Sequence, residues 1–232
     1  MPIYWLSEDS LAFPDHSLSE PNGVMAIGGD LSPERLLMAY QLGIFPWYHP
    51  GENILWWSPD PRFVLFPDDL KVQRSMRPYF NQSKFQVTFD QHFETVMRQC
   101  ADRREGTWIS EEMVDGYVRL HELGYAHSLE VWEDEHLVGG LYGIALGKCF
   151  FGESMFTKVD NASKFGFITL VRRLGQLGYV LIDCQQQTRH LSRMGARAIS
   201  REKFLEYLSE NTEKPTHRGR WTNILEEEPP TE

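Results

Sequence analysis

A carboxylate and an amide stand two residues apart in the segment YVLIDCQQQ, which begins at Tyr179. The apolar residues before Asp183 are typical of a buried strand, and side chains in a strand alternate between its two faces. If the strand continues, Asp183 and Gln185 point to the same face. An amide accepts and donates hydrogen bonds but is no strong base, whereas a carboxylate can orient it or stabilise a positive charge. An aspartate at a strand end could instead only cap the following turn.

The residue types that often form metal or redox sites show no such pattern. The cysteines are odd in number and have no C-x-x-C spacing (Cys100, Cys149 and Cys184). We therefore expect no disulfide framework and no metal site. The N-terminus lacks the basic region and apolar core of a signal peptide, and no apolar run approaches membrane-spanning length. These features predict a soluble, cytoplasmic protein with no membrane partner.

The chain is acidic overall but contains one local run of basic residues. Its 232 residues include 23 basic and 33 acidic ones, which give a net charge of −10. This balance argues against a protein that coats nucleic acid with a broad basic face. Between positions 71 and 84 there are nevertheless four basic residues and no acidic one: Lys71, Arg74, Arg77 and Lys84. If this segment is helical, Arg74 and Arg77 share one face. An ordinary solvated helix face is the alternative.

The first part of the chain, residues 1–62, is predicted to form a small N-terminal domain. It contains one clear helix, with the sequence ERLLMAYQL, an N-cap at Ser32 or Asp30 and an end at Gly43. The segment 43–62 holds four prolines and three tryptophans. We expect ordered, turn-rich structure there, with little regular secondary structure. Its aromatic rings could be buried under a covering lobe or could form the wall of a binding site.

The remainder of the chain alternates between strands and helices. We assign residues 63–221 to a larger second domain and residues 222–232 to an acidic, disordered tail. The pattern predicts an α+β fold, in which a mostly antiparallel sheet gains a further strand after a helix. Strands are expected at 62–66, 85–89, 126–132, 137–146, 149–156, 179–184 and 196–200. Helices are expected at 72–80, 92–103, 111–123, 162–178, 188–195 and 201–211.

This order of elements is similar to the second half of the GNAT acyltransferases. Those enzymes usually bind the pyrophosphate of coenzyme A at a glycine-containing turn that opens a helix. Here the corresponding segment, GESMFTKVDNASKFG, lacks that glycine pattern and places Asp160 at the helix start, where it would repel a pyrophosphate. We therefore expect a GNAT-like domain with a mixed, mostly antiparallel sheet and a different acyl donor.

Longer motifs make the resemblance more specific. The segments EPNGVMAIGGDLSPERLLMAYQLGIFPWY, LWWSPDPR, GTWIS, HELGYAHSLEVW, LVGGLYG, FFGESMF, NASK and LIDCQ occur in this order between about Leu6 and Tyr207. Together they resemble the leucyl/phenylalanyl-tRNA–protein transferase family. The resemblance implies an aminoacyltransferase that moves Leu or Phe, and less well Met, from aminoacyl-tRNA to the N-terminal Arg or Lys of an acceptor protein. The product is a degradation signal of the N-end rule pathway.

The implied reaction sets simple chemical requirements. An aminoacyl-tRNA is an activated ester, so we expect no cofactor, metal or covalent enzyme intermediate. The acceptor α-amine has a reference pKa of about 7.7–8.0, so the enzyme must align the amine with the ester and remove a proton from it. We expect the enzyme to act as a monomer.

The resemblance also implies positions for the site. It places Asp183 and Gln185 at the catalytic pair, where the amide oxygen of Gln185 would accept a hydrogen bond from the amine and Asp183 would orient the amide. A rival mechanism moves the proton through a ribose hydroxyl of the terminal adenosine and leaves the pair as positioning groups. Glu153 is implied to meet the positive N-terminal residue or a ribose hydroxyl. Trp47 and Trp108 are implied to hold the terminal adenosine by stacking.

Further positions are implied for the amino-acid pocket and for the tRNA backbone. Leu141 and Leu170 stand where the family is expected to have Met and an aromatic residue, and adaptable Met155 suits ligands of different shape. The implied pocket residues are Leu141, Phe150, Met155 and Ile182, and the implied tRNA contacts are Lys71, Arg74, Arg77 and Lys84. Two alternatives stay open: a coenzyme A-dependent GNAT N-acetyltransferase, and a noncatalytic module that binds tRNA or a degradation signal.

Overall fold

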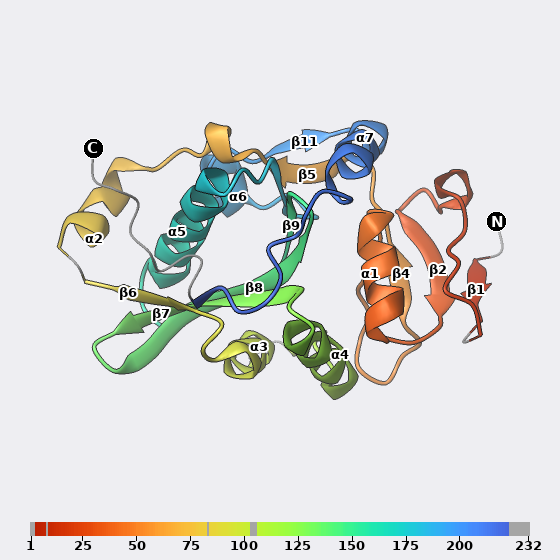
Figure 1. The fold of residues 1–232 in the computed structure, drawn as a ribbon, viewed down its shortest axis with the longest axis horizontal. Coiled ribbons are helices and arrows are strands. Elements are labelled where there is room, and N and C mark those ends of the chain that lie inside the picture. The colour runs from red at the N-terminus through yellow and green to blue at the C-terminus, as the bar shows by residue number, and fades with distance from the viewer. Residues whose placement is uncertain (1–2, 8, 83, 103–105, 223–232) are drawn as a thin grey trace.

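The computed structural model describes residues 3–7, 9–82, 84–102 and 106–222 (Figure 1). The secondary structure forms one sheet of four strands and one of seven, with helices packed around them. This architecture confirms the predicted α+β class. The predicted division at residue 62 falls at the start of the larger sheet and stays a prediction. The predicted tail lies outside the described residues, apart from Thr222.

Four short strands form the N-terminal sheet, in the order β1 (Tyr4–Leu6), β2 (Val24–Gly28), β4 (Leu55–Trp57) and β3 (Phe45–Pro46). β1 pairs parallel with β2, and the other pairs are antiparallel. The sequence did not predict this sheet, because strands of two or three residues are too short to show an alternating pattern. Helix α1 (Pro33–Gln41) was predicted, including its cap at Ser32, whose side chain accepts the N–H of Arg35.

The larger sheet contains a single parallel pair of neighbours. β9 and β10 run parallel, and the remaining neighbours are antiparallel, so the prediction of a mixed, mostly antiparallel sheet is confirmed. In spatial order its strands are β11 (Arg197–Ile199), β5 (Arg62–Leu65), β10 (Leu181–Asp183), β9 (Cys149–Thr157), β8 (His136–Leu146), β7 (Ala126–Glu133) and β6 (Gln86–Phe89).

Helices cover both faces of the larger sheet (Figure 1). On one side lie α5 (Ala162–Gln176) and α6 (Arg189–Arg193), over a core that includes Leu129 of β7. On the other side lie α3 (Phe93–Ala101) and α4 (Glu111–Glu122), over a core that includes Tyr142 of β8. This second core continues into the N-terminal sheet, where Trp56 is fully buried, and it takes in Phe204 of α7 (Arg201–Asn211).

One predicted helix is broken. Residues 72–80 contain a single 3-10 turn, Arg74–Met76, followed by the short helix α2 (Arg77–Asn81). Pro78 explains the break, because proline has no N–H to continue a helical hydrogen-bond ladder. Two further 3-10 turns span His16–Leu18 and Pro67–Asp69. Within the described ranges, no helix is both long and apolar enough to cross a membrane, and no group of metal-ligating side chains could hold an ion.

Candidate active site

A cavity of about 310 Å³ lies where β3 approaches the middle of the larger sheet. Its walls come from β3 and the residue after it, from β8, β9 and β10, from α5, and from the segment that leads into α6. The structure brings together every residue that the sequence assigned to catalysis or to binding of the amino acid and adenosine. They are Trp47, Trp108, Leu141, Phe150, Glu153, Met155, Ile182, Asp183 and Gln185.

The polar end of the cavity forms where the parallel pair of strands separates. Asp183 is the last residue of β10 and pairs with Phe151, whereas β9 continues to Thr157. Glu153 therefore faces the chain that follows β10. The Nε2 atom of Gln185 donates a hydrogen bond to Oε1 of Glu153 at 2.8 Å.

The environment of Asp183 differs from the sequence-based expectation. Its carboxylate is fully buried and accepts two hydrogen bonds from Arg62, at 2.8 Å from Nε and 2.5 Å from Nη2. β10 also does not continue through Gln185, which has a left-handed φ of 60°. Oδ1 of Asp183 accepts the backbone N–H of Gln185 at 2.9 Å. Asp183 thus holds the backbone of Gln185, and the expectation that it orients the side-chain amide is wrong.

Arg62 ties this corner of the site to the N-terminal part of the chain. Its Nη1 donates to the carbonyl oxygen of Gly43, directly after α1, at 3.2 Å. Its guanidinium lies between the rings of Phe45 and Phe204, at 4.7 and 4.6 Å from their centroids. A planar cation held in this way presents a fixed pair of donors to Asp183.

Glu153 is the carboxylate that faces the cavity without a cationic partner. Tyr40 donates to its Oε1 at 2.7 Å, Tyr117 donates to its Oε2 at 3.1 Å, and the two phenol oxygens lie 2.5 Å apart. Among the described residues, no ion pair includes Glu153. Burial raises the pKa of Glu153 to about 7, and the negative charge of Asp183 adds to this, whereas the hydrogen bonds from Tyr40, Tyr117 and Gln185 oppose it.

The two tyrosines meet because α1 and α4 pack closely. Tyr40 lies in α1 and Tyr117 in α4, and both are fully buried. A Cβ atom at Gly116 would lie 2.8 Å from the carbonyl oxygen of Leu31, so a larger residue would push α4 away. Neither tyrosine nor Arg62 could be predicted from the sequence as a site residue, since each is of a type that is common in an ordinary helix or strand.

The other end of the cavity is apolar. Leu141 of β8 pairs with Met155 of β9, while Phe150 and Ile182 pair across β9 and β10. The structure adds residues that the sequence analysis did not select: Phe45, Pro46, Tyr142, Phe167, Thr188 and Leu191, among others. Leu170 is buried but is not part of the lining. Phe167, three residues earlier on α5, supplies an aromatic ring there instead.

Two tryptophans stand at the rim of this cavity. Trp47 is 36% exposed and follows β3, and Trp108 is half-buried just before α4. Trp57 supports Trp47, since its Nε1 donates to the carbonyl oxygen of Trp47 at 2.6 Å and the rings lie 5.5 Å apart. Partly exposed rings at a cavity mouth are suited to stacking on a base.

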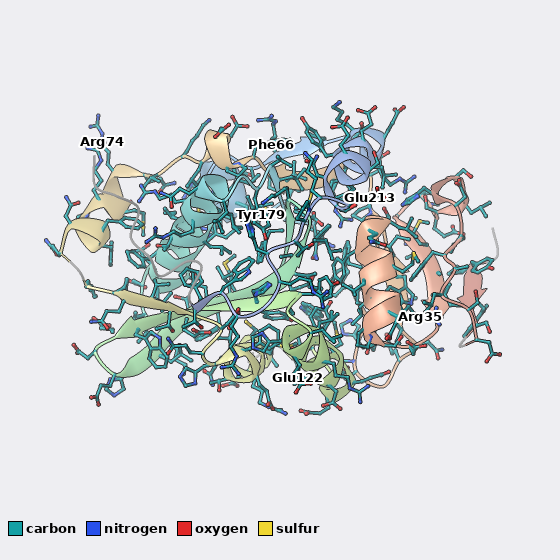
Figure 2. All side chains as sticks on the ribbon, viewed as in Figure 1. Arg35, Phe66, Arg74, Glu122, Tyr179 and Glu213 are labelled. Carbon is teal, nitrogen blue, oxygen red and sulfur yellow. The ribbon has the colours of Figure 1, made fainter. Side chains whose placement is uncertain are left out.

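The four residues predicted to contact tRNA lie elsewhere and are all exposed. Arg74 and Arg77 belong to the 3-10 turn and to α2, and Figure 2 shows Arg74 extending outward from that end of the molecule. Lys84 forms an ion pair with Glu133 at 3.2 Å. Lys71 lines a second cavity, beside α6.

Comparisons with known proteins match two parts of the chain to one family. Residues 64–209 match the family described as "Leucyl/phenylalanyl-tRNA protein transferase", and residues 29–60 match its N-terminal domain. The curated protein "Leucyl/phenylalanyl-tRNA--protein transferase" of Pseudomonas fluorescens (strain Pf0-1) is 55% identical over 220 residues, covering 93% of this chain and 97% of the relative. The protein of the same name from Cellvibrio japonicus (strain Ueda107) is 59% identical over 218 residues, covering 92% and 93%.

Similarity to solved structures is much weaker. A GCN5-related N-acetyltransferase from Kribbella flavida superposes with a TM-score of 0.39 at 11% identity, covering 70% of this chain and 59% of that one. That score is too low to support a conclusion. The sequence matches, in contrast, extend over nearly the whole chain. The chain therefore belongs to the leucyl/phenylalanyl-tRNA protein transferase family.

Proposed function

We propose that the protein moves Leu or Phe, and less well Met, from aminoacyl-tRNA to the N-terminal Arg or Lys of an acceptor protein, which creates an N-end rule degradation signal. Family membership supports the reaction type. The observation that carries the proposal is one cavity with an apolar end for a side chain and the Glu153–Gln185 pair at its polar end.

The apolar end suits the amino acid of the donor. A volume of about 310 Å³ is at the small end of ligand pockets, which matches an amino acid with part of a nucleoside. Leu141, Phe150 and Ile182 are buried, whereas the unbranched side chain of Met155 can adapt to a branched or an aromatic ligand. Trp47 and Trp108 would stack on the terminal adenine.

The polar end suits the acceptor amine. Because Nε2 of Gln185 donates to Glu153, its amide oxygen is the atom left to accept an N–H of the amine. The amine nitrogen forms a bond to the ester carbonyl carbon, and the bond to the ribose oxygen then breaks. A raised pKa makes Glu153 a suitable acceptor for the proton that the amine loses, and the departing ribose oxygen takes up a proton. The negative charge of Glu153 also favours a positive N-terminal residue.

Asp183 acts in this proposal as a positioning residue. Its bonds to Arg62 and to the backbone N–H of Gln185 fix the left-handed turn that aims the amide into the cavity. In the rival mechanism, a ribose hydroxyl carries the proton, and Glu153 and Gln185, like Asp183, only position other groups. The two mechanisms differ in what happens to a donor that lacks the terminal 2′-hydroxyl, because only the ribose mechanism fails with it.

A transfer assay with purified protein tests the proposed function. Labelled Phe-tRNA is mixed with a peptide that begins with Arg, or with the same peptide acetylated at its N-terminus. We expect mass spectrometry to find one Phe added to the free α-amine, with no product from the acetylated peptide and no effect of a chelator. Binding of tRNA without transfer would favour a binding module. Acetyl transfer from acetyl-coenzyme A would favour the acetyltransferase alternative.

A further inference from the structure

A second cavity, of about 230 Å³, lies against α6 and is strongly basic. No acidic side chain lines it, while four cationic side chains and one histidine do. Its lining consists of Lys71, Gln73, Met76, Lys164, Ile168, Arg189, His190, Arg193 and Met194. Arg189 and Arg193 are four residues apart on α6, so they share one helix face.

The positive charge of this cavity is not neutralised by the protein. Within the described part of the chain, none of its lysines or arginines takes part in an ion pair. Nζ of Lys164 donates only to the amide oxygen of Asn161, at 2.8 Å. The Nε2 atom of His190 is buried and has no hydrogen-bond partner. Burial lowers the pKa of His190, and the charge of Lys164 lowers it further. Buried polar atoms normally have partners, so an anion with acceptor oxygens fits this site.

The position of the cavity connects it to the active site. Thr188 and Leu191 line the active-site cavity, whereas Arg189, His190 and Arg193 of the same segment line the basic one. α6 has only five residues, so one short helix and the residue before it border both cavities. Directly after α6, the carbonyl oxygen of Met194 accepts a hydrogen bond from the backbone N–H of Lys71 at 2.9 Å. Lys71 thereby joins the cavity to the segment that carries Arg74 and Arg77.

We propose that the basic cavity binds phosphodiester groups of the single-stranded 3′ end of the aminoacyl-tRNA, next to the nucleoside in the active site. The inference rests on the proposed function. Arginine side chains offer paired donors that match a phosphate, and the lining has no phenylalanine, tyrosine or tryptophan ring on which a base could stack. Contacts of this kind fix the register of the strand without reading its sequence. The cavity would also guide the 3′ end from the exposed arginines towards the ester site.

The test uses the double substitution Arg189→Gln with Arg193→Gln in the full chain. Arg119→Gln with Arg220→Gln is the matched control, because it removes the same charge at exposed positions that line neither cavity. The probe is a short fluorescent oligoribonucleotide ending in CCA, and the measurement is its dissociation constant between 50 and 200 mM salt. If each arginine meets one phosphate, the salt slope falls by about 1.4 units. The factor by which the fourfold salt increase weakens RNA binding is then about sevenfold smaller in the double variant than in the control.

Two further ligands separate the alternatives. A stable amide analogue of phenylalanyl-adenosine, which has no phosphate, should bind the double variant and the control equally. Equal salt slopes in variant and control would overturn the proposal, as would equal losses for RNA and for the phosphate-free analogue. Tight binding of coenzyme A that depends on the two arginines, with RNA unaffected, would overturn both this proposal and the proposed function. A failed transfer assay together with the expected RNA result would overturn the proposed function alone.

Discussion

Glu153 and Asp183 are two carboxylates of one site, and their surroundings give them different tasks. Asp183 is fully buried and accepts hydrogen bonds from Nε and Nη2 of Arg62, so it is fixed in place. Glu153 faces the cavity and has only neutral donors around it, which leaves its negative charge uncompensated. A carboxylate of this second kind can exchange a proton near neutral pH. The proposed chemistry therefore centres on Glu153 and Gln185.

The pH dependence of transfer tests the role of Glu153. Below pH 7 both the acceptor amine and Glu153, with its pKa of about 7, must lose a proton before reaction. A plot of the logarithm of kcat/KM for the peptide against pH should then rise with a slope near two. Glu153→Gln should lower the rate by about 10²–10⁴-fold and reduce the slope to near one. Identical profiles in both proteins would exclude Glu153 as the proton acceptor.

The same substitution should alter stability in a predictable direction. A folded-state pKa of about 7, above the ordinary value of 4.5, means that the folded protein holds the proton more tightly than the unfolded chain. The tighter binding of this proton contributes fully to the stability of the folded protein below pH 4.5, and the contribution is lost as the pH rises towards 7. Thermal melting of Glu153→Gln should therefore show a smaller loss of stability between pH 5 and 8 than the unsubstituted protein. A larger loss would contradict the raised pKa.

Arg62 and Asp183 form a buried ion pair, so we expect the effects of substituting them on the free energy of unfolding to be strongly coupled. Arg62→Met or Asp183→Leu alone leaves a buried charge without its partner and should lower the free energy of unfolding by about 3–5 kcal/mol. The double substitution should cost far less than the sum, because no buried charge remains. Denaturant titration of the four proteins measures this, with the exposed Arg98→Met as a control of little effect. Additive losses would contradict the coupling.

The sequence and its family resemblance identified part of the lining of the site but not its internal contacts. The residues from Trp47 to Gln185 carry recognisable motifs, and all of those selected for the cavity lie in it. Tyr40, Tyr117 and Arg62 were missed, because they reach the site through contacts between segments 36 to 121 positions apart in the chain. The role of Asp183 depends on the left-handed backbone conformation of Gln185, which no local sequence pattern predicts.

The length of a helix or strand decided whether the sequence could predict it. Strands such as β7 and β8 have at least eight residues and were found, together with the caps of α1 and α4. The N-terminal sheet was not found, since three of its strands have only two or three residues. The segment of residues 72–80 reads as one helix, but Pro78 divides it into a 3-10 turn and a short helix.

This broken segment is where the exposed arginines of the proposed tRNA surface lie. Arg74→Ala with Arg77→Ala should weaken binding of Leu-tRNA and Phe-tRNA to the same extent, because phosphate contacts carry no sequence information. The salt slope should fall by roughly two units if each arginine meets one phosphate of a duplex stem. Filter binding at several salt concentrations measures both effects. An unchanged slope would make the two arginines ordinary solvated residues.

The end of the described chain packs against the larger sheet. Trp221 is fully buried, stacks on His127 at 3.8 Å and contacts the ring of Phe150, which lines the active-site cavity. Its backbone N–H donates to Asp90 at 2.7 Å. Sequence reasoning could not find this contact, because nothing around residue 221 has a helical or strand-like period.

Removal of this ring should destabilise the whole protein. Trp221→Ala is expected to lower the free energy of unfolding by about 3–5 kcal/mol, because it leaves a large cavity beside Phe150. Trp5→Ala provides the matched control, since Trp5 is 64% exposed and its loss should change stability by less than about 0.5 kcal/mol. Urea unfolding monitored by circular dichroism compares the two. Equal midpoints for both variants would contradict an anchoring role for Trp221.

In the proposed mechanism, Gln185 is held by Glu153 and receives the acceptor amine. The most direct measurement is the single-turnover rate of Phe transfer from Phe-tRNA to a peptide beginning with Arg, for Gln185→Ala and for Gln187→Ala. Gln187 is an exposed residue of the same type, two positions away, and does not line the cavity. We predict that Gln185→Ala lowers the rate by about 10²–10³-fold at unchanged Phe-tRNA affinity, while Gln187→Ala transfers normally. Equal rates in the two folded variants would exclude Gln185 as the group that receives the amine.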